Sequence, residues 1–349
     1  MLAIGADVHK KWTTFHALDE NGEPVKEFNR KFGSVPSNRE GFEELAEYLN
    51  GKEHMILLEN STKTHDVYWT MKDLGLDVIV AHSTDLARIT KSDKKNDKND
   101  AKELAMYMRG KTLNMDQFSV CYMCAEKDMK RRRLCRVAKR EMMNEGNIKR
   151  KIRSEMLLFG IELDEDSVSS KRALKAMESL NDPVMSALVG MMRDCQNRRK
   201  ELEKAILKEF TGDPIYEKLM TIPYFGPVTS SYMSAIIVDI DRFRSKKALS
   251  SSFGLVPRQR DSGETQSHCH ITKTGDPHAR WLLIQAVFSH VSNCPDSQLT
   301  EFFNRLNEGS IAERKAADKK PYVQRKALVA AARKMTCIIY AILKNDRSW

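Results

Sequence analysis

The sequence lacks any hydrophobic run that approaches the roughly eighteen apolar residues of a transmembrane helix. The apolar character of its first residues, MLAIGADVHKKW, ends at Asp7, and this pattern argues against a secretory signal. Proline and glycine are scarce, at 10 and 16 of 349 residues, and no low-complexity tract is present, which excludes collagen-like and disordered chains. We therefore predict a globular cytoplasmic protein without membrane contact.

Cysteine is equally sparse, and the seven residues are odd in number and scattered, as expected of reduced intracellular thiols. Cys121 and Cys124 form a CxxC pair, but no second Cys or His pair follows at the spacing of a zinc ribbon. His268 and His270 also lack a second ligand pair nearby, although alternate residues of a strand share a face. We therefore predict partly buried thiols and surface histidines instead of a zinc site.

What the sequence does contain is an excess of positive charge. Lys and Arg number 58 against 48 Asp and Glu, a formal net charge of +10, and 349 residues are enough for two or three domains. The excess is dense between residues 127 and 153, where three acids stand among the basic residues. A solvated helix face would alternate in sign, so we favour contact with nucleic-acid phosphates over that alternative. The cations assigned to this contact are Arg131, Arg132, Arg133, Arg136, Lys139, Arg140, Lys149, Arg150 and Lys151.

The pattern at the start of the chain predicts strands. Apolar and β-branched residues alternate over 2–6, 12–18 and 25–28, and a turn signal at 19–22 joins the last two segments. We therefore predict three consecutive antiparallel strands.

Helices and further strands are predicted to follow. Ser37 and Glu40 form a capping box before an apolar helical stripe, and buried-type strands follow at 55–58 and 78–81. A further helix opens near Asp97. The resulting order, βββαβαβα, predicts an α/β domain with a mixed sheet flanked by helices, as in ribonuclease-H-like nucleases.

Four acids are predicted to converge in this domain. Asp7 lies near the end of the first strand and Glu59 directly after the fourth, and these strands are neighbours in the predicted sheet. Asp97 and Asp100 are three residues apart and so share a helix face. Each has an individual alternative: Asp97 as a helix N-cap, Glu59 as a loop acid, Asp7 as a turn residue. Together, oxygen ligands of this kind predict a site for Mg²⁺ or Mn²⁺ that polarises a phosphodiester.

A second candidate site surrounds Ser262. This serine precedes Gly263 in a polar loop, and Arg258, Arg260, Lys273 and Arg280 flank it. The four cations could clamp a phosphate beside a serine nucleophile. The alternative is a phosphate-binding turn in which the serine has no covalent role.

The rest of the chain is predicted to be helical. Apolar residues between 185 and 209 recur at alternating three- and four-residue steps, with lapses at Arg199 and Glu209, which predicts a coiled-coil seam within one chain or between chains. Residues 219–229, with Gly226 and Pro227 between two apolar segments, are similar to a helix-hairpin-helix, a unit that holds phosphates through backbone N–H groups.

These motifs, taken in order, resemble those of the DEDD transposases of the insertion-sequence one-ten family. The resemblance spans essentially the whole chain. The residues that carry it are IGADVHK (4–10), Glu59, Asp97 with KNDAKELA (98–105), IP and FGP within 222–227, FGLVP (253–257), Ser262 with Gly263, ITKTGD (271–276) and AARK (331–334).

The resemblance implies three domains: a RuvC-like domain over 1–112, a basic coiled-coil region over 113–212 and a C-terminal transposase domain over 213–349. It implies a recombinase that uses a non-coding bridge RNA to choose target and donor DNA. Asp7, Glu59, Asp97 and Asp100 correspond to the four acids, and Ser262 to the serine that joins a DNA 5′ phosphate. We further expect a homo-oligomer, a dimer or a tetramer, whose active site combines residues of two protomers.

Two positions depart from the family pattern. Tyr224 replaces the first glycine of the hairpin, which bears on its phosphate binding, and Asp261 precedes the serine where a small or neutral polar residue is usual.

Two other functions remain open. A junction resolvase that hydrolyses DNA with metal and water would not need Ser262, and a non-catalytic nucleic-acid-binding protein would need none of the four acids.

Overall fold

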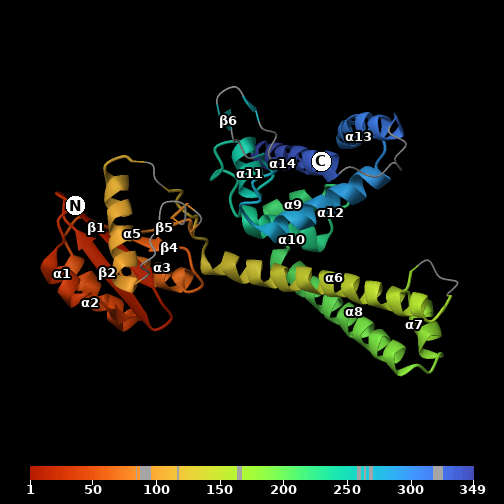
Figure 1. Cartoon of the computed structure of the whole chain (residues 1–349), viewed down its shortest axis with the longest axis horizontal. Coiled ribbons are helices and arrows are strands. Elements are labelled where there is room, and N and C mark those ends of the chain that lie inside the picture. Colours follow the sequence, from red (N-terminus) through yellow and green to blue (C-terminus); the bar gives the residue numbers. More distant parts are fainter. Residues whose placement is uncertain are drawn as a thin grey trace. The chain divides into compact units, whose positions relative to one another are not determined.

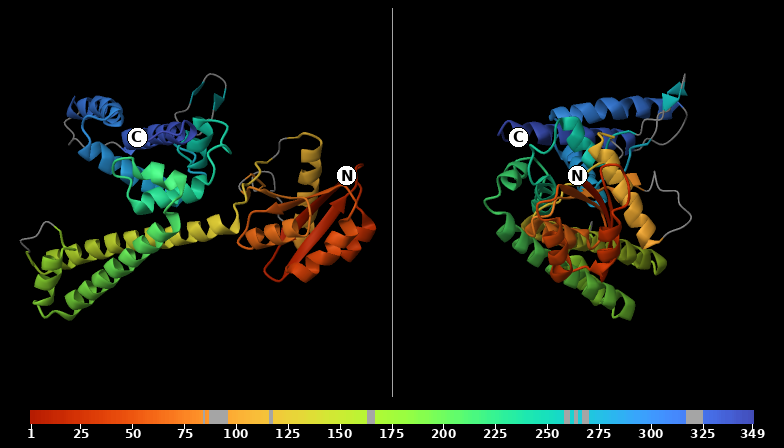
Figure 2. Two further views of the ribbon diagram at one scale, coloured as in Figure 1. Left: turned by 180° about the vertical axis from the view of Figure 1, so that it is seen from behind. Right: turned by 90° about the vertical axis from the view of Figure 1, so that its left-hand side faces the viewer.

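The structure is a computed structural model of the chain, and it divides into two compact units, residues 1–123 and 124–349 (Figures 1 and 2). It describes residues 1–83, 85–86, 96–115, 118–162, 167–257, 261–262, 265–266, 270–316 and 325–349, with the backbone alone at 261–262, 265–266 and 309–316. None of the helices in these ranges combines the length and hydropathy of a membrane span. The division into three domains over 1–112, 113–212 and 213–349 stays a prediction.

The first unit is built on a five-stranded mixed sheet. Its strands lie in the order β3-β2-β1-β4-β5, with β2 antiparallel to β1 and β3, and with β4 parallel to β1 and β5. The strands are β1 (Leu2–Val8), β2 (Trp12–Leu18), β3 (Val35–Pro36), β4 (His54–Glu59) and β5 (Val78–Ala81). The predicted mixed sheet, with the first strand beside the one that ends at Glu59, is confirmed.

Helices cover both faces of this sheet. They are α1 (Lys26–Lys31), α2 (Arg39–Leu49), α3 (Thr64–Asp73) and α5 (Asp97–Thr112). Because side chains alternate along a strand, Ile4 packs with residues of α1, α2 and α3, whereas Ala3 packs with Leu104 and Met108 of α5. Helix α5 therefore lies on the opposite face of β1 from α1, α2 and α3, where its N-terminus can reach the carboxyl ends of β1 and β4.

Two local predictions in this unit are wrong. Residues 25–28 form no strand, since Lys26–Lys31 is helix α1 and the third strand is the short β3. Phe28 and Phe32 lie one helical turn apart and are both fully buried, and a helix achieves this pairing where a strand would not. Ser37 is not the N-cap of α2, because Asn38 accepts the hydrogen bond of the Gly41 N–H instead.

The second unit is almost entirely helical. Helices α6 (Glu126–Leu158) and α8 (Pro183–Phe210) lie side by side as a long hairpin, with α7 (Lys171–Glu178) at its end (Figures 1 and 2). The other elements are α9 (Pro214–Met220), α10 (Pro227–Ile237), α11 (Lys246–Ser252), β6 (Asp261–Ser262), β7 (Thr265–Gln266), α12 (Pro277–Asn293), α13 (Gln298–Ala316) and α14 (Arg325–Lys344). Tyr232, Phe253, Leu283 and Met335 contribute to their common hydrophobic core.

The seam predicted in α8 packs within the chain. Its apolar members Met185, Leu188, Met192, Cys195 and Ile206 are buried.

Arg199 and Glu209, the two charged residues that interrupt the apolar pattern of this seam, contact charged residues of α6. Arg199 forms an ion pair with Glu145 at 2.5 Å, and Glu209 accepts a hydrogen bond from Arg131 at 3.1 Å. The positions that interrupt the apolar pattern thus carry ion pairs across the hairpin. Both the apolar and the charged contacts correspond to the intrachain alternative of the prediction.

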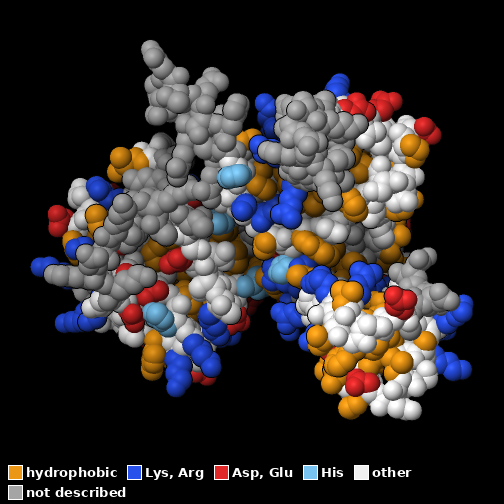
Figure 3. All heavy atoms as spheres, turned by 45° about the vertical axis from the view of Figure 1, so that its right-hand side comes forward, with side chains coloured by type: hydrophobic (Ala, Val, Ile, Leu, Met, Phe, Trp, Pro, Cys, Tyr) orange, Lys and Arg blue, Asp and Glu red, His pale blue; other side chains and the backbone are white. Residues whose placement is uncertain are grey.

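The end of the hairpin exposes hydrophobic side chains. Leu157, Leu158 and Phe159 are 85%, 73% and 67% exposed. Figure 3 shows hydrophobic side chains gathered over this end of the hairpin, with Lys and Arg around them. Clustered apolar residues with a polar border are typical of protein contact surfaces.

Candidate functional site

The first candidate site lies where β1 and β4 end. The parallel register pairs Ala6 with Leu58, so Asp7 and Glu59 are the next residues on two adjacent strands. The Asp7 side chain is only 17% exposed, whereas Glu59 is on the surface. The predicted convergence of these two acids at one edge of the sheet therefore agrees with the strand register.

Helix α5 carries the other two acids toward Asp7. The helix begins at Asp97, but Asn96 is its N-cap and accepts from the Lys98 N–H, so Asp97 is not occupied in capping. Burial raises the pKa of Asp7, His9 opposes the rise, and the negative charges of Asp100 and Asp97 add to it. Asp7 is thus close enough to Asp97 and Asp100 to be affected by their negative charges, a repulsion that a divalent cation would relieve.

Gly5 permits the close approach of α5 to β1. A Cβ atom at this position would lie 2.1 Å from the carbonyl oxygen of Ala101 and 2.3 Å from the backbone nitrogen of Ala105. No side chain fits there unless the helix moves. Gly5 therefore sets the separation between Asp7 and the acids at the start of α5.

We expect Gly5→Ala to destabilise the first unit by about 3 kcal/mol, because overpacking against helix backbone cannot be relieved by a rotamer change. The displaced helix should also weaken Mn²⁺ binding. Denaturant unfolding and metal titration measure the two effects. Gly190→Ala, at a helical position of α8 with nothing within 4 Å of the added Cβ, is the matched control and should be neutral or stabilising. Equal stability of Gly5→Ala and the native protein would contradict this account.

The structure adds His9, a site residue that the sequence analysis missed. Its Nε2 lies 3.0 Å from Asp7 Oδ2 and 3.4 Å from Asp97 Oδ1, and Asp7 raises the pKa of this imidazole. One ligand atom from each of Asp7, His9 and Asp97 lies within 4.8 Å of the other two. A signal was present in the sequence, because residues two apart at the end of a strand share a face.

The side chains of this site suit a divalent cation. Asp7, Asp97 and Asp100 supply carboxylate oxygens, the ligands preferred by Mg²⁺ and Mn²⁺, and His9 adds an imidazole nitrogen. The CxxC cysteines lie elsewhere: Cys121 is half-buried, Cys124 is buried, and burial raises the pKa of Cys121 to about 11. Protonated thiols of this kind are poor metal ligands.

Ser262 lies in a short hairpin of the second unit. Its strand β6 pairs with β7, with Ser262 opposite Thr265. Arg258, Arg260, His268 and Gly263 lie outside the described residues, and the side chains of Asp261 and Ser262 are not described. The relation of the serine to the flanking cations therefore stays a prediction.

The hairpin is joined to the rest of the second unit by residues 252–257 on one side and 270–276 on the other, which we call the stem. Hydrogen bonds and close backbone contacts hold the stem tightly. The Thr272 N–H donates to the Val256 carbonyl at 2.8 Å, and the Arg280 guanidinium donates to the Phe253 carbonyl at 3.0 Å. Gly254 and Gly275 both have positive φ, and a Cβ on Gly275 would lie 1.9 Å from the Ser252 carbonyl oxygen. Arg280, predicted to clamp a phosphate, thus binds the base of the stem.

Lys273, the remaining cation of the predicted clamp, lies on the returning side of the stem. Its N–H donates to the Gly254 carbonyl at 3.2 Å, and its φ is 56°. The stem backbone therefore fixes where the Lys273 side chain starts.

Three of the predicted nucleic-acid contacts on α6 are occupied inside the second unit. Arg131 is 9% exposed and binds Glu209 and Asp213, the latter at 2.7 Å. Arg132 donates to the Ala235 carbonyl at 2.8 Å. Lys139 is 4% exposed and lies over the Trp281 ring. These side chains hold α6 against the other helices.

Other cations of α6 are exposed. Arg133, Arg136 and Arg140 are spaced by three and four residues, so they form one basic face of the helix. Arg136 also lies 3.6 Å from Asp276, which accepts a hydrogen bond from the Tyr232 hydroxyl. Lys149 is half-buried and pairs with Glu145, whereas Arg150 and Lys151 are exposed. The accessible part of the predicted interface therefore centres on Arg133 and Arg140.

We expect the double variant Arg133→Glu and Arg140→Glu to weaken binding of unrelated DNA and RNA duplexes alike. Each lost phosphate contact should lower the slope of log K against log salt by about 0.9, so the slope should fall by about 2. Lys200→Glu with Lys204→Glu, exposed residues of α8, makes the same change in net charge and is the control. An unchanged slope in the α6 variant would remove this face from the interface.

The turn between α9 and α10 has a backbone conformation that favours glycine at the position of Tyr224. Tyr224 has φ of 69°, the left-handed region that favours glycine. Its side chain is 49% exposed, so the ring is accommodated at the surface. Tyr224 therefore adopts the backbone conformation that a glycine would adopt here, and the helix-hairpin-helix stays a prediction.

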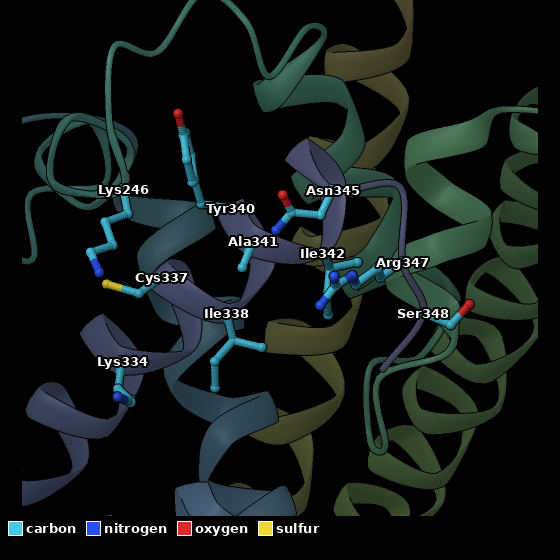
Figure 4. Close-up of a pocket in the computed structure, with 10 residues that line it drawn as sticks. All are labelled: Lys246, Lys334, Cys337, Ile338, Tyr340, Ala341, Ile342, Asn345, Arg347 and Ser348. Carbon is cyan, nitrogen blue, oxygen red and sulfur yellow. The ribbon is translucent and has the colours of Figure 1, made fainter.

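A surface pocket of about 320 Å³ lies apart from the predicted residues (Figure 4). Lys246 of α11, Lys334 and Tyr340 of α14, and Arg347 line it, together with apolar residues of α14. Among the described residues, none of the sequence-predicted site residues lines it. Its lining residues all come from the second unit.

Two family models match the chain, one over the first unit and the start of α6, the other over part of the second unit. A model described as "Transposase", that of the DEDD transposases of IS110, matches residues 4–140, and a model described as "Transposase IS116/IS110/IS902 family" matches residues 216–304. The first match contains all four predicted acids, and the second contains Ser262.

Curated relatives show the same similarity over shorter stretches. A probable family 20 transposase of Pseudomonas aeruginosa is 28% identical over 155 residues, which cover 44% of this chain and 43% of that protein. The transposase for insertion sequence element IS1328 of Yersinia enterocolitica is 30% identical over 30% of this chain and 32% of its own length. The transposase for insertion sequence element IS1111A of Coxiella burnetii is 31% identical over 38% of this chain and 34% of its own length. The chain thus spans less than half the length of each of these relatives.

Proposed function

We propose that this chain, which belongs to the IS116/IS110/IS902 family of transposases, is a DNA transposase that cuts and rejoins DNA at the ends of an insertion sequence. The family models confirm the resemblance seen in the sequence motifs, and they match the segments that carry the acids and the serine. The observation that carries the proposal furthest is the convergence of Asp7 with the acids at the start of α5.

The four acids are proposed to hold a divalent cation, Mg²⁺ or Mn²⁺. Asp7, Asp97 and Asp100 would bind it from β1 and α5, and Glu59 from the end of β4. A cation held there would polarise a phosphodiester and stabilise the charge that develops in the transition state. The mutual repulsion of the carboxylates around Asp7 supports this assignment.

Ser262 is proposed to be the nucleophile. Its hydroxyl would lose a proton as its oxygen forms a bond to phosphorus, and the bond from phosphorus to the DNA 3′ oxygen would break. The products are a 5′ phosphoserine and a free 3′-hydroxyl. Attack of a 3′-hydroxyl on the phosphoserine would then rejoin DNA and release the serine, so no phosphodiester energy is lost. The anchored stem below the hairpin supports a positioning role for this segment.

The proposed partners are target DNA, donor DNA and a non-coding bridge RNA that selects both. The net charge of +10 and the exposed cations of α6 support contact with nucleic acid. A homo-oligomer, a dimer or a tetramer, is also proposed, and the exposed apolar end of the hairpin supports a contact with another protein chain.

The experiment that tests this function combines RNA sequencing with recombination. Protein purified from cells that carry the whole element should contain one discrete RNA from its flank, and it should join donor to target DNA in the presence of that RNA. Only random cellular RNA, with recombination independent of it, would contradict RNA guidance. DNA hydrolysis without joining would instead identify a metal-dependent junction resolvase, which the acid cluster fits equally well.

A further inference from the structure

We propose that His9 is a ligand of the metal held by the acids, and that its nitrogen makes the site prefer Mn²⁺ to Mg²⁺. The inference rests on the proposed function, since it concerns the same cation, but it assigns a role to a residue outside the four acids. Two observations and one chemical argument lead to it.

The first observation is where the imidazole lies. Nε2 of His9 is within 3.0 Å of one carboxylate oxygen of Asp7 and within 3.4 Å of one of Asp97. An atom placed among these three would touch ligands from both β1 and α5. His9 is 51% exposed, so solvent and a phosphate can still reach the open side.

The second observation is that the backbone of His9 is fixed at both of its polar groups. Its N–H donates to the Trp12 carbonyl at 2.9 Å, which closes the turn between β1 and β2. Its carbonyl accepts from the Ser37 hydroxyl at 2.9 Å. Ser37 is 5% exposed, and its hydroxyl also contacts that of Thr13 at 2.8 Å. The turn therefore presents the ring from a defined position, as a metal ligand requires.

The third argument is chemical. Mg²⁺ selects oxygen ligands and keeps much of its water, whereas an imidazole nitrogen suits transition metals, whose affinity for mixed nitrogen and oxygen sites exceeds that of Mg²⁺. A site of carboxylates alone discriminates little between Mg²⁺ and Mn²⁺. Addition of His9 would shift the balance toward Mn²⁺ while leaving the carboxylates available to both cations.

The test is pulsed electron paramagnetic resonance of Mn²⁺ bound to the full-length protein labelled with ¹⁵N-histidine. We expect a ¹⁵N coupling in the native protein, its loss in His9→Asn, and a fall in Mn²⁺ affinity of about tenfold, with Mg²⁺ affinity, measured by competition, changed less than about twofold. His54→Asn is the matched control, because His54 lies at the opposite end of β4 from Glu59 and should leave the coupling unchanged.

The other outcomes separate this inference from the proposed function. Stoichiometric Mn²⁺ binding that Asp7→Asn abolishes, without any ¹⁵N coupling, would show that the carboxylates hold metal and that His9 is only a partner of Asp7. That result overturns the inference and leaves the proposed function standing. Absence of Mn²⁺ and Mg²⁺ binding in the native protein would overturn both.

Discussion

Alanine at Ser262 is expected to eliminate strand exchange and the covalent intermediate together. A methyl group cannot attack phosphorus, so neither the phosphoserine nor the rejoined product can form. The measurement is a protein–DNA adduct that survives denaturation, maps to the peptide containing Ser262 and is absent from Ser262→Ala. Activity should fall below detection, because no other group replaces the serine oxygen.

Two further results make the serine experiment decisive. Ser262→Cys keeps a nucleophilic atom of different size and should retain at most a trace of adduct. Arg280→Lys, which alters the hydrogen bond to Phe253 at the base of the stem, should slow adduct formation without changing its products. Free 5′ phosphates with no adduct at any time, and normal cleavage by Ser262→Ala, would identify a hydrolytic nuclease.

Removal of any one acid is expected to abolish recombination and leave the fold intact. Alanine at Asp7, Glu59, Asp97 or Asp100 removes an oxygen ligand from the metal, and strand cleavage should fall by at least about a thousandfold. Cleavage by each variant on supercoiled and linear donor DNA measures the effect. Activity of Asp100→Ala close to that of the native protein would remove it from the site.

Asp7→Asn should not be less stable than the native protein in the absence of metal. Because burial and neighbouring acids raise the pKa of Asp7, its ionised form is disfavoured in the folded state, and this cost appears as pH rises through the range where Asp7 ionises. Asp7→Asn should therefore gain stability relative to the native protein at neutral pH and lose this advantage in acid. A loss of stability at neutral pH would show that the acids serve the fold rather than a cation.

The acids could be predicted because they depend on the order of strands. Once a strand ending at Asp7 is placed beside a strand ending at Glu59, both carboxylates must lie at one edge of the sheet, and β1 and β4 have this arrangement. The third strand could not be predicted in the same way. Val25 to Phe28 alternates over too few residues to distinguish a strand from one turn of helix, and the decisive contact was between Phe28 and Phe32.

The basic helix shows a different limit of sequence reasoning. Arg131, Arg132 and Arg133 are adjacent in the sequence and equally charged, so composition treats them alike. In the structure Arg131 is held by Glu209 and Asp213, Arg132 by backbone carbonyls, and Arg133 is exposed. Which cations face solvent depends on the helices that pack against α6, and these lie far away in the sequence.

The parallel pairing of β1 with β4 also has a consequence for the timing of synthesis. Asp7 is synthesised before Glu59, and the acids of α5 follow only after β4 and β5. Contacts of such long sequence separation carry a larger loop-closure entropy cost and form more slowly than local contacts. A nascent or truncated chain that ends before α5 lacks Asp97 and Asp100. Under the proposed function, such a chain would lack two of the four proposed metal ligands.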